Sequence, residues 1–139
     1  MASLRRTIAT ASVALLLVGG LAACNPDPTG GTRPPPPGSS APAYGWAMRA
    51  ATRADLPHSW REGCPVHWRD LTRVSVAYWG YDGACHAGAL FVHDSVARQV
   101  RDIFGHLYEH RFQIRRIHPV DTYGGSDDRS LAANHTSAF

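Results

Sequence analysis

The fold is decided by residues 71–93, which read LTRVSVAYWGYDGACHAGALFVH. In the first nine letters the side chains alternate between two faces, and many are β-branched or aromatic, which is typical of a strand. Residues 80–83, GYDG, have the composition of a tight turn, and residues 86–93 read as a second strand. The stretch therefore predicts a β-hairpin.

An amphipathic helix is expected immediately after the hairpin. Apolar residues recur at helical spacing and give one apolar stripe, which consists of Val96, Val100, Ile103, Phe104, Leu107 and Tyr108. Residues 112–120, FQIRRIHPV, alternate again and predict a further strand. A polar loop follows, and the β-branched and aromatic residues within 136–139 predict the beginning of another strand. The order of these elements predicts an α+β fold with an incomplete sheet.

The folded part is expected to begin near Tyr44. Residues 44–60 mix large apolar side chains with arginine and alanine, which predicts a short helix before Pro57. Residues 24–43 are rich in proline, glycine and serine and contain almost no large apolar side chain, so we expect a disordered linker. With 139 residues, the chain has room for one modest domain with a small core.

Residues 1–23 have the layout of a lipoprotein signal peptide. Arg5 and Arg6 give a basic start, and an apolar run and small residues follow. The run is shorter than the roughly 20 apolar residues of a membrane-spanning helix. Leu21-Ala22-Ala23-Cys24 resembles the lipobox of bacterial lipoproteins, in which the cysteine is acylated and becomes the mature N-terminus. The alternative is an ordinary signal peptide with a chance cysteine. The favoured interpretation is an exported protein, anchored in the cell membrane through lipid on Cys24.

The charge of the chain bears on its partners. It contains 14 arginines and no lysine, and without Arg5 and Arg6 the remaining 12 arginines stand against 11 acidic residues. Surfaces that bind nucleic acid usually carry a clustered excess of positive charge. The composition therefore argues against a nucleic-acid partner.

Residues 106–110, HLYEH, match the inverted zincin signature His-x-x-Glu-His. Helical spacing puts His106 and His110 on one side, where they could bind zinc with Glu109 as base. Such enzymes need a third ligand, and only 29 residues follow the motif. The alternative is that His110 covers the core at the edge of the apolar stripe.

A series of further motifs runs through residues 59–139. They are Gly63-Cys64-Pro65-Val66, Tyr78-Trp79-Gly80, His86-x-Gly88-x-Leu90-x-Val92, Phe104-x-x-Leu107-Tyr108-x-x-Arg111-Phe112-x-Ile114, Asp121-x-Tyr123-Gly124-Gly125-Ser126-Asp127-Asp128 and Asn134-x-Thr136-Ser137-Ala138-Phe139. With these motifs in this order, the chain resembles the N-terminal half of the zinc D-alanyl-D-alanine carboxypeptidases and L-alanyl-D-glutamate endopeptidase-like proteins of actinobacteria. The resemblance covers essentially the whole folded part.

The resemblance implies a Hedgehog/DD-peptidase-like fold and peptidoglycan stem peptides as partners. In such proteins Thr-Ser-Ala-Phe leads into a strand ending in Cys-Arg, and the zinc ligands and the catalytic acid follow. All of these would lie beyond Phe139. Residues 44–139 are therefore expected to be a truncated N-terminal part of the peptidase domain, without zinc and inactive, although zinc is the cofactor of the full-length family. The rival is a complete non-catalytic lipoprotein that binds peptidoglycan or a protein partner.

The resemblance also suggests site residues. Tyr123, Asn134 and Ser137 belong to its last motifs and are candidates for the substrate cleft. With Cys24 lipidated, Cys64 and Cys85 remain in an oxidising compartment, where they could pair with each other. In the family, however, the partner of Cys64 is expected just past Phe139, which predicts an unpaired Cys64 in this chain.

Overall fold

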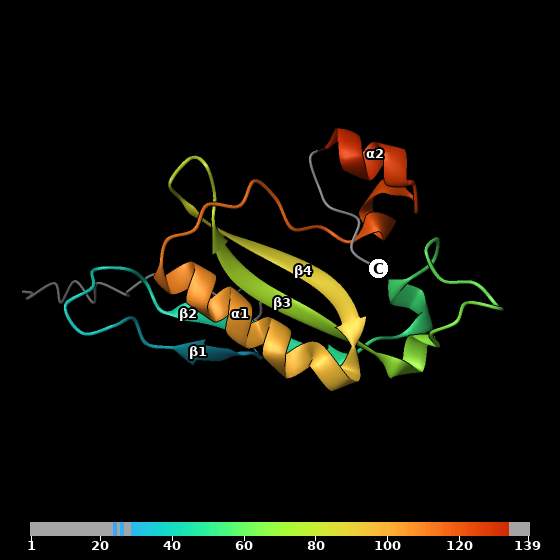
Figure 1. Cartoon of the computed structure of the whole chain (residues 1–139), viewed down its shortest axis with the longest axis horizontal. Coiled ribbons are helices and arrows are strands. Elements are labelled where there is room, and N and C mark those ends of the chain that lie inside the picture. Colours follow the sequence, from blue (N-terminus) through green and yellow to red (C-terminus); the bar gives the residue numbers. More distant parts are fainter. Residues whose placement is uncertain (1–23, 25, 27–28, 134–139) are drawn as a thin grey trace, which may run out of the picture.

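The computed structural model describes residues 24, 26 and 29–133. In this part of the chain four strands form one antiparallel sheet in the order β1-β2-β3-β4. The strands are β1 (Gly31–Arg33), β2 (Tyr44–Ala50), β3 (Leu71–Trp79) and β4 (Cys85–His93). Helix α1 (Ala97–Glu109) lies across one face of the sheet, and the short helix α2 (Asp127–Ala132) lies beyond β4 (Figure 1). The predicted α+β class is confirmed.

The predicted hairpin is confirmed as β3 and β4. Its register runs from Leu71 opposite His93 to Trp79 opposite Cys85, without a break. In the turn, the amide of Gly80 donates to the carbonyl of Ala84 at 2.8 Å. Gly83 has a φ of 73°, which a residue without Cβ adopts at little cost.

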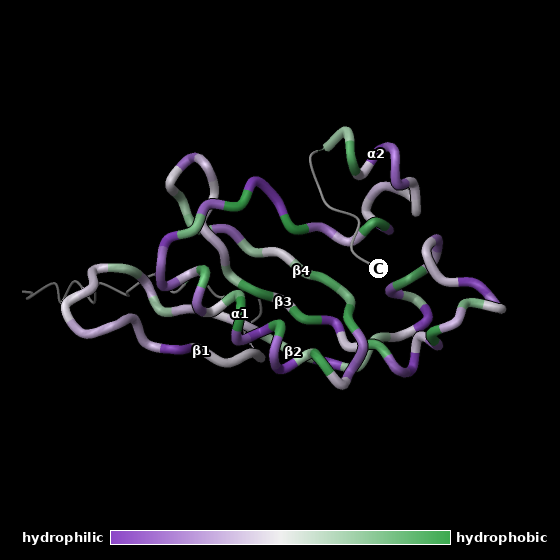
Figure 2. The backbone as a smooth tube through the Cα atoms, in the orientation of Figure 1, coloured by the Kyte–Doolittle hydropathy of each residue, from purple (hydrophilic) through white to green (hydrophobic). Residues whose placement is uncertain are grey.

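The core lies between α1 and the face of the sheet that it covers. Val74 and Val76 of β3 are completely buried there, and Figure 2 shows the apolar run of β3 through the middle of the sheet. The hydroxyl of Tyr44 donates to the carbonyl of Arg101 on α1 at 3.0 Å, which fixes β2 to the helix. The predicted helix is confirmed, but its stripe is narrower than expected, because Ile103 is 55% exposed.

The far end of α1 is held by an aromatic contact. The ring of Trp79 stacks on Tyr108 with 5.3 Å between the centroids, and its indole N–H donates to the carbonyl of Tyr108 at 3.0 Å. The amide of Ile114 then donates to the carbonyl of Trp79 at 2.8 Å. Trp79 therefore joins the hairpin, the helix and the segment that follows the helix.

The short helix expected within residues 44–60 is wrong. Residues 44–50 form the strand β2, and only Arg53–Asp55 make a single 3₁₀ turn. Trp46 pairs with Val76 of β3, so alternate β2 side chains pack toward α1. Packing between sheet and helix outweighs the helix propensity of the alanine, methionine and arginine residues.

The expected linker is partly built into the fold. Gly31–Arg33 form the edge strand β1, which pairs with the first half of β2. The guanidinium of Arg33 lies 2.9 Å from the carboxylate of Glu109 and 5.4 Å from the ring centre of Tyr44. A single charged side chain thus ties this edge of the sheet to α1.

The strand predicted at residues 112–120 is also wrong. This segment makes an isolated bridge between Gln113 and Trp79, and the carbonyl of Ile117 accepts from the amide of Ala89 at 3.1 Å. Arg111 has a φ of 53°, so the chain turns sharply as it leaves α1. That turn and Pro119 limit the pairing of this alternating segment to two points.

Asp121 holds the C-terminal part of the described chain against the loop between β2 and β3. Its carboxylate accepts from the amides of His58 at 2.8 Å and Ser59 at 3.0 Å, and from the hydroxyl of Ser59. Hydrogen bonds to a charged acceptor are about twice as strong as neutral ones. This clamp fixes the 3₁₀ turn Val120–Tyr123, in which Thr122 lines a cleft.

Candidate functional site

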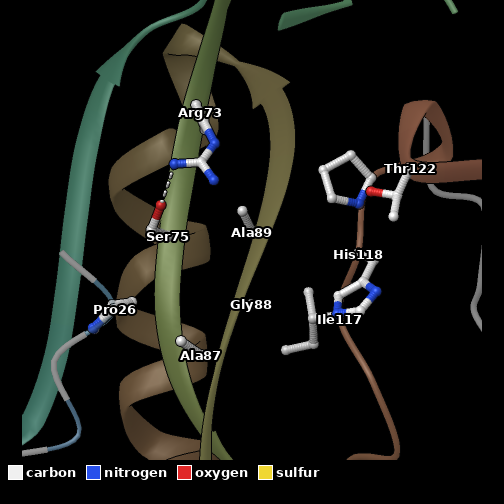
Figure 3. A pocket seen from close by; sticks show the side chains of 10 residues that line it. Pro26, Arg73, Ser75, Ala87, Gly88, Ala89, Ile117, His118 and Thr122 are labelled. Atoms are coloured by element: carbon white, nitrogen blue, oxygen red, sulfur yellow. Dashed lines mark hydrogen bonds between the residues drawn. The ribbon is translucent and has the colours of Figure 1, made fainter.

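A cleft of about 260 Å³ opens on the face of the sheet that α1 does not cover. Figure 3 shows Arg73 and Ser75 on the side of β3 that points away from α1. The residues that line the cleft come from β3, β4, the segment after α1 and the N-terminal stretch: Pro26, Arg73, Ser75, Ala87, Gly88, Ala89, Ile117, His118, Pro119 and Thr122. The volume lies below the roughly 300–1,000 Å³ of sites for drug-sized ligands, so it suits a small group or the end of a chain.

Small residues form the floor of the cleft. Ser75 is opposite Ala89, and Ala77 is opposite Ala87, so that side chains of one or two heavy atoms cover the middle of this face of the hairpin, next to the pair of Arg73 and Phe91. Gly88 has Ile117 beside it, and a Cβ at this glycine would lie 2.5 Å from the Cβ of Ile117. The missing side chain allows residues 117–119 to approach β4 and form the wall.

Arg73 provides the charge of the cleft. Its guanidinium donates to the hydroxyl of Ser75 at 2.9 Å, and it forms no ion pair with the residues that the structure describes. Ser75 is only 4% exposed, so the hydroxyl lies deep in the floor. The cleft therefore combines a positive group, a hydroxyl and an apolar wall.

His118 and Tyr123 stand together at the wall. The phenol oxygen of Tyr123 lies 3.3 Å from Nδ1 of His118, and the two rings stack with 6.4 Å between their centres. Tyr123, predicted as a cleft residue, thus contacts a lining residue and follows another, Thr122. Asn134 and Ser137, predicted with it, lie outside the described residues.

The pKa of His118 is lowered, first by burial of the imidazole and then by the positive charge of Arg116. We expect NMR titration to place this pKa below the ordinary value of about 6.5. The unfolded chain therefore binds this proton at a higher pH than the folded chain does. The contribution of His118 to the free energy of unfolding is complete above about pH 6.5, and it is lost as the pH falls through the pKa of the folded protein. Arg116→Gln should raise the pKa part of the way, and a wild-type pKa at or above 6.5 would contradict this assignment.

The pair His106 and His110 lies on α1 and at its C-cap, away from the cleft. The carboxylate of Glu109 is engaged by Arg33 at 2.9 Å and lies 3.4 Å from Nδ1 of His106. Residues 24, 26 and 29–133 contain no group of three His, Cys, Asp or Glu side chains that could hold a metal. The structure thus brings no third ligand to the predicted zinc motif within this range.

The suggested pairing of Cys64 with Cys85 is wrong. Cys85 is joined to Cys24, with 6.0 Å between their Cα atoms, a usual separation for a disulfide. Cys64 is a free thiol in the loop that precedes β3, whereas Cys85 begins β4 opposite the end of β3. Since β3 has nine residues, its first and last residues lie roughly 25–30 Å apart, and the two cysteines lie near opposite ends of it.

The bond to Cys85 also bears on the predicted lipid anchor. A sulfur that carries a lipid thioether has no bond left for a disulfide, so lipidation of Cys24 and the Cys24–Cys85 bond exclude each other in one molecule. None of the helices in the described ranges is long and apolar enough to cross a bilayer.

Comparisons with protein-family models, with curated proteins and with solved structures found no match. The family resemblance of residues 59–139 therefore stays a prediction. Arg73 and Ser75 were not among the predicted site residues. The available signal was that Arg73, Ser75 and Ala77 follow one another on one face of a strand whose other face carries Val74 and Val76.

Proposed function

We propose that residues 44–139 form the N-terminal part of an exported zinc peptidase that acts on peptidoglycan. Its type is that of the D-alanyl-D-alanine carboxypeptidases and L-alanyl-D-glutamate peptidases, and its fold is Hedgehog/DD-peptidase-like. The motifs in residues 59–139 support the family. The observation that carries the proposal is the cleft on the sheet face opposite α1, which has one cationic group and room for a short peptide end.

In this proposal the described residues supply the scaffold and part of the substrate cleft. Amide hydrolysis at zinc needs three protein ligands, an open metal position and a carboxylate that moves protons. The resemblance assigns these groups to a segment beyond Phe139. We therefore propose that the cleft of the described residues binds peptidoglycan stem peptides.

The proposed location is outside the cytoplasmic membrane, with Cys24 as the lipid-anchored N-terminus. The sequence of residues 21–24 supports the anchor. Residues 34–43 lead from β1 to β2 and make no helix or strand. A multiply acylated cysteine holds a protein firmly at a membrane, whereas one acyl chain binds only marginally.

A second candidate is a non-catalytic lipoprotein that binds peptidoglycan or a protein partner. It is favoured by the make-up of the cleft, whose lining offers a guanidinium, a hydroxyl and an apolar wall as binding groups. The DNA that follows codon 139 separates the candidates, because a continuing frame that encodes Cys-Arg and the zinc-ligand segment supports only the peptidase.

We expect the 139-residue chain to bind a stem pentapeptide, to retain no zinc after dialysis and to release no D-alanine. A longer chain that includes the downstream frame should bind zinc and hydrolyse the peptide, and His106→Ala should leave that activity largely intact. The measurements are metal analysis of both chains, calorimetric titration with the peptide, and assays of D-alanine release and L-alanyl-D-glutamate cleavage.

Two results would overturn the proposal. Stoichiometric zinc on the 139-residue chain, lost in His106→Ala and in His110→Ala, would favour the inverted zincin at His106, Glu109 and His110. A longer chain that binds the peptide but takes up no zinc would favour the non-catalytic lipoprotein.

A further inference from the structure

Two arginines face each other across the central strands. In the register of β2 and β3, Arg49 is directly opposite Arg73, so both side chains belong to the sheet face that α1 leaves open. Like charges at directly opposite positions destabilise a sheet unless other groups compensate them. The two arginines differ in whether a carboxylate of the protein compensates their positive charge.

Arg49 has an internal carboxylate partner. Its two terminal nitrogens donate to the two oxygens of Asp55 at 2.7 Å and 2.5 Å, a bidentate pair. The guanidinium of Arg49 is the main cause of the lowered pKa of Asp55. Asp55 is fixed in turn by the amide of Thr52 at 2.8 Å, so this ion pair is part of the fold.

Arg73 has no such carboxylate among the described residues. One of its nitrogens donates to Ser75, which uses one of the five N–H donors of a guanidinium. The side chain is half-buried and lines the cleft, where the small floor residues leave space in front of it (Figure 3). A planar guanidinium with unused donors in a small cleft matches the geometry of a carboxylate.

We propose that Arg73 and Ser75 form a binding site for the carboxylate of a small ligand, either a free acid or the C-terminus of a peptide. The carboxylate of the ligand pairs with the guanidinium of Arg73 in the way that the carboxylate of Asp55 pairs with the guanidinium of Arg49. Ser75 orients the guanidinium, and the apolar wall formed by Ile117 and Pro119 contacts the carbon atoms of the ligand. Binding of a carboxylate at Arg73 requires neither zinc nor hydrolysis.

The test follows amide signals of the 139-residue chain by NMR during titration with acetate, with acetyl-alanyl-alanine and with the C-terminal amide of that dipeptide. We expect the free dipeptide to shift Arg73, Ser75 and the residues around His118, and the amide to leave them unchanged. If acetate shifts the same residues, the site accepts a free acid. If only the dipeptide does, the site requires a chain end.

Arg73→Gln should weaken carboxylate binding at least about tenfold, as expected for loss of a charged hydrogen-bonding partner. The matched control is Arg98→Gln on the exposed side of α1, which should change affinity less than about twofold. Ala87→Leu fills the cleft without removing the charge and should also abolish binding, which covers the case of a poorly folded Arg73 variant. Equal binding of acid and amide, or full affinity in a folded Arg73→Gln or Ala87→Leu variant, would refute the site.

Discussion

Replacing Trp79 with alanine is expected to lower the free energy of unfolding by about 3–5 kcal/mol, the usual cost of removing a large aromatic side chain from a core. The indole is 7% exposed, stacks on Tyr108 and donates a hydrogen bond to its carbonyl. A whole domain is stabilised by only about 5–15 kcal/mol. The variant should therefore be largely unfolded or unfold at much lower urea concentration, as measured by far-ultraviolet circular dichroism.

The matched control for this prediction is Trp68→Ala. Trp68 lies on a 3₁₀ turn, is half-buried and has Arg69 against its ring at 4.6 Å. We expect a loss below about 1 kcal/mol, as is usual for substitutions near the surface. Trp79→Phe should fall between the two, because it retains a ring but loses the N–H donor. Equal losses for Trp79→Ala and Trp68→Ala would show that Trp79 does not join the hairpin to α1.

The hairpin and α1 were predictable because each buries one side of a regular repeat. Val74 and Val76 alternate with Ser75 and Ala77 at the period of a strand, and α1 has its apolar residues at the period of a helix. Both patterns result from local chain geometry together with burial, so no knowledge of distant residues is needed. The α+β class followed from the order of these elements.

The other strands depend on contacts between distant residues. β1 contains no large apolar residue, and its place is fixed by Arg33 against Glu109 and Tyr44, far away in the sequence. β2 has residues of good helix propensity and becomes a strand because β3 is available to pair with it. Residues 112–120 alternate like a strand but leave α1 through the turn at Arg111.

The site was the least predictable part for a related reason. A cleft forms where side chains are small, and a pattern of small residues on a strand carries little signal in the sequence. Gly88 and Ile117 meet across 29 positions, and this meeting creates the wall. Tyr123 was suggested by a family motif and is found beside the cleft. The role of Arg73 is indicated only by comparison with Arg49, which has the carboxylate of Asp55 as a partner, whereas Arg73 has no carboxylate among the described residues.

The chemistry at Cys24 gives the second prediction of large effect. We expect the mature wild-type protein to partition into the detergent phase and Cys24→Ala to move to the aqueous phase, because acyl chains on the cysteine supply the membrane affinity. Cys85→Ser is the matched control and should remain in the detergent phase, since it removes the partner sulfur but leaves the acylation site. Phase separation in detergent followed by immunoblotting measures all three.

Thiol counting after denaturation separates the lipid from the disulfide at the same sulfur. A lipidated Cys24 leaves Cys64 and Cys85 as two free thiols per chain, whereas the Cys24–Cys85 bond leaves only Cys64. The anchor proposal therefore requires two reactive thiols in the detergent-phase protein, and reduction should not increase that number. One thiol that rises to three on reduction, in protein that stays in the aqueous phase, would reject the lipid. It would instead establish the disulfide as the bond that holds the N-terminal segment to β4, because thioether and disulfide cannot share one sulfur.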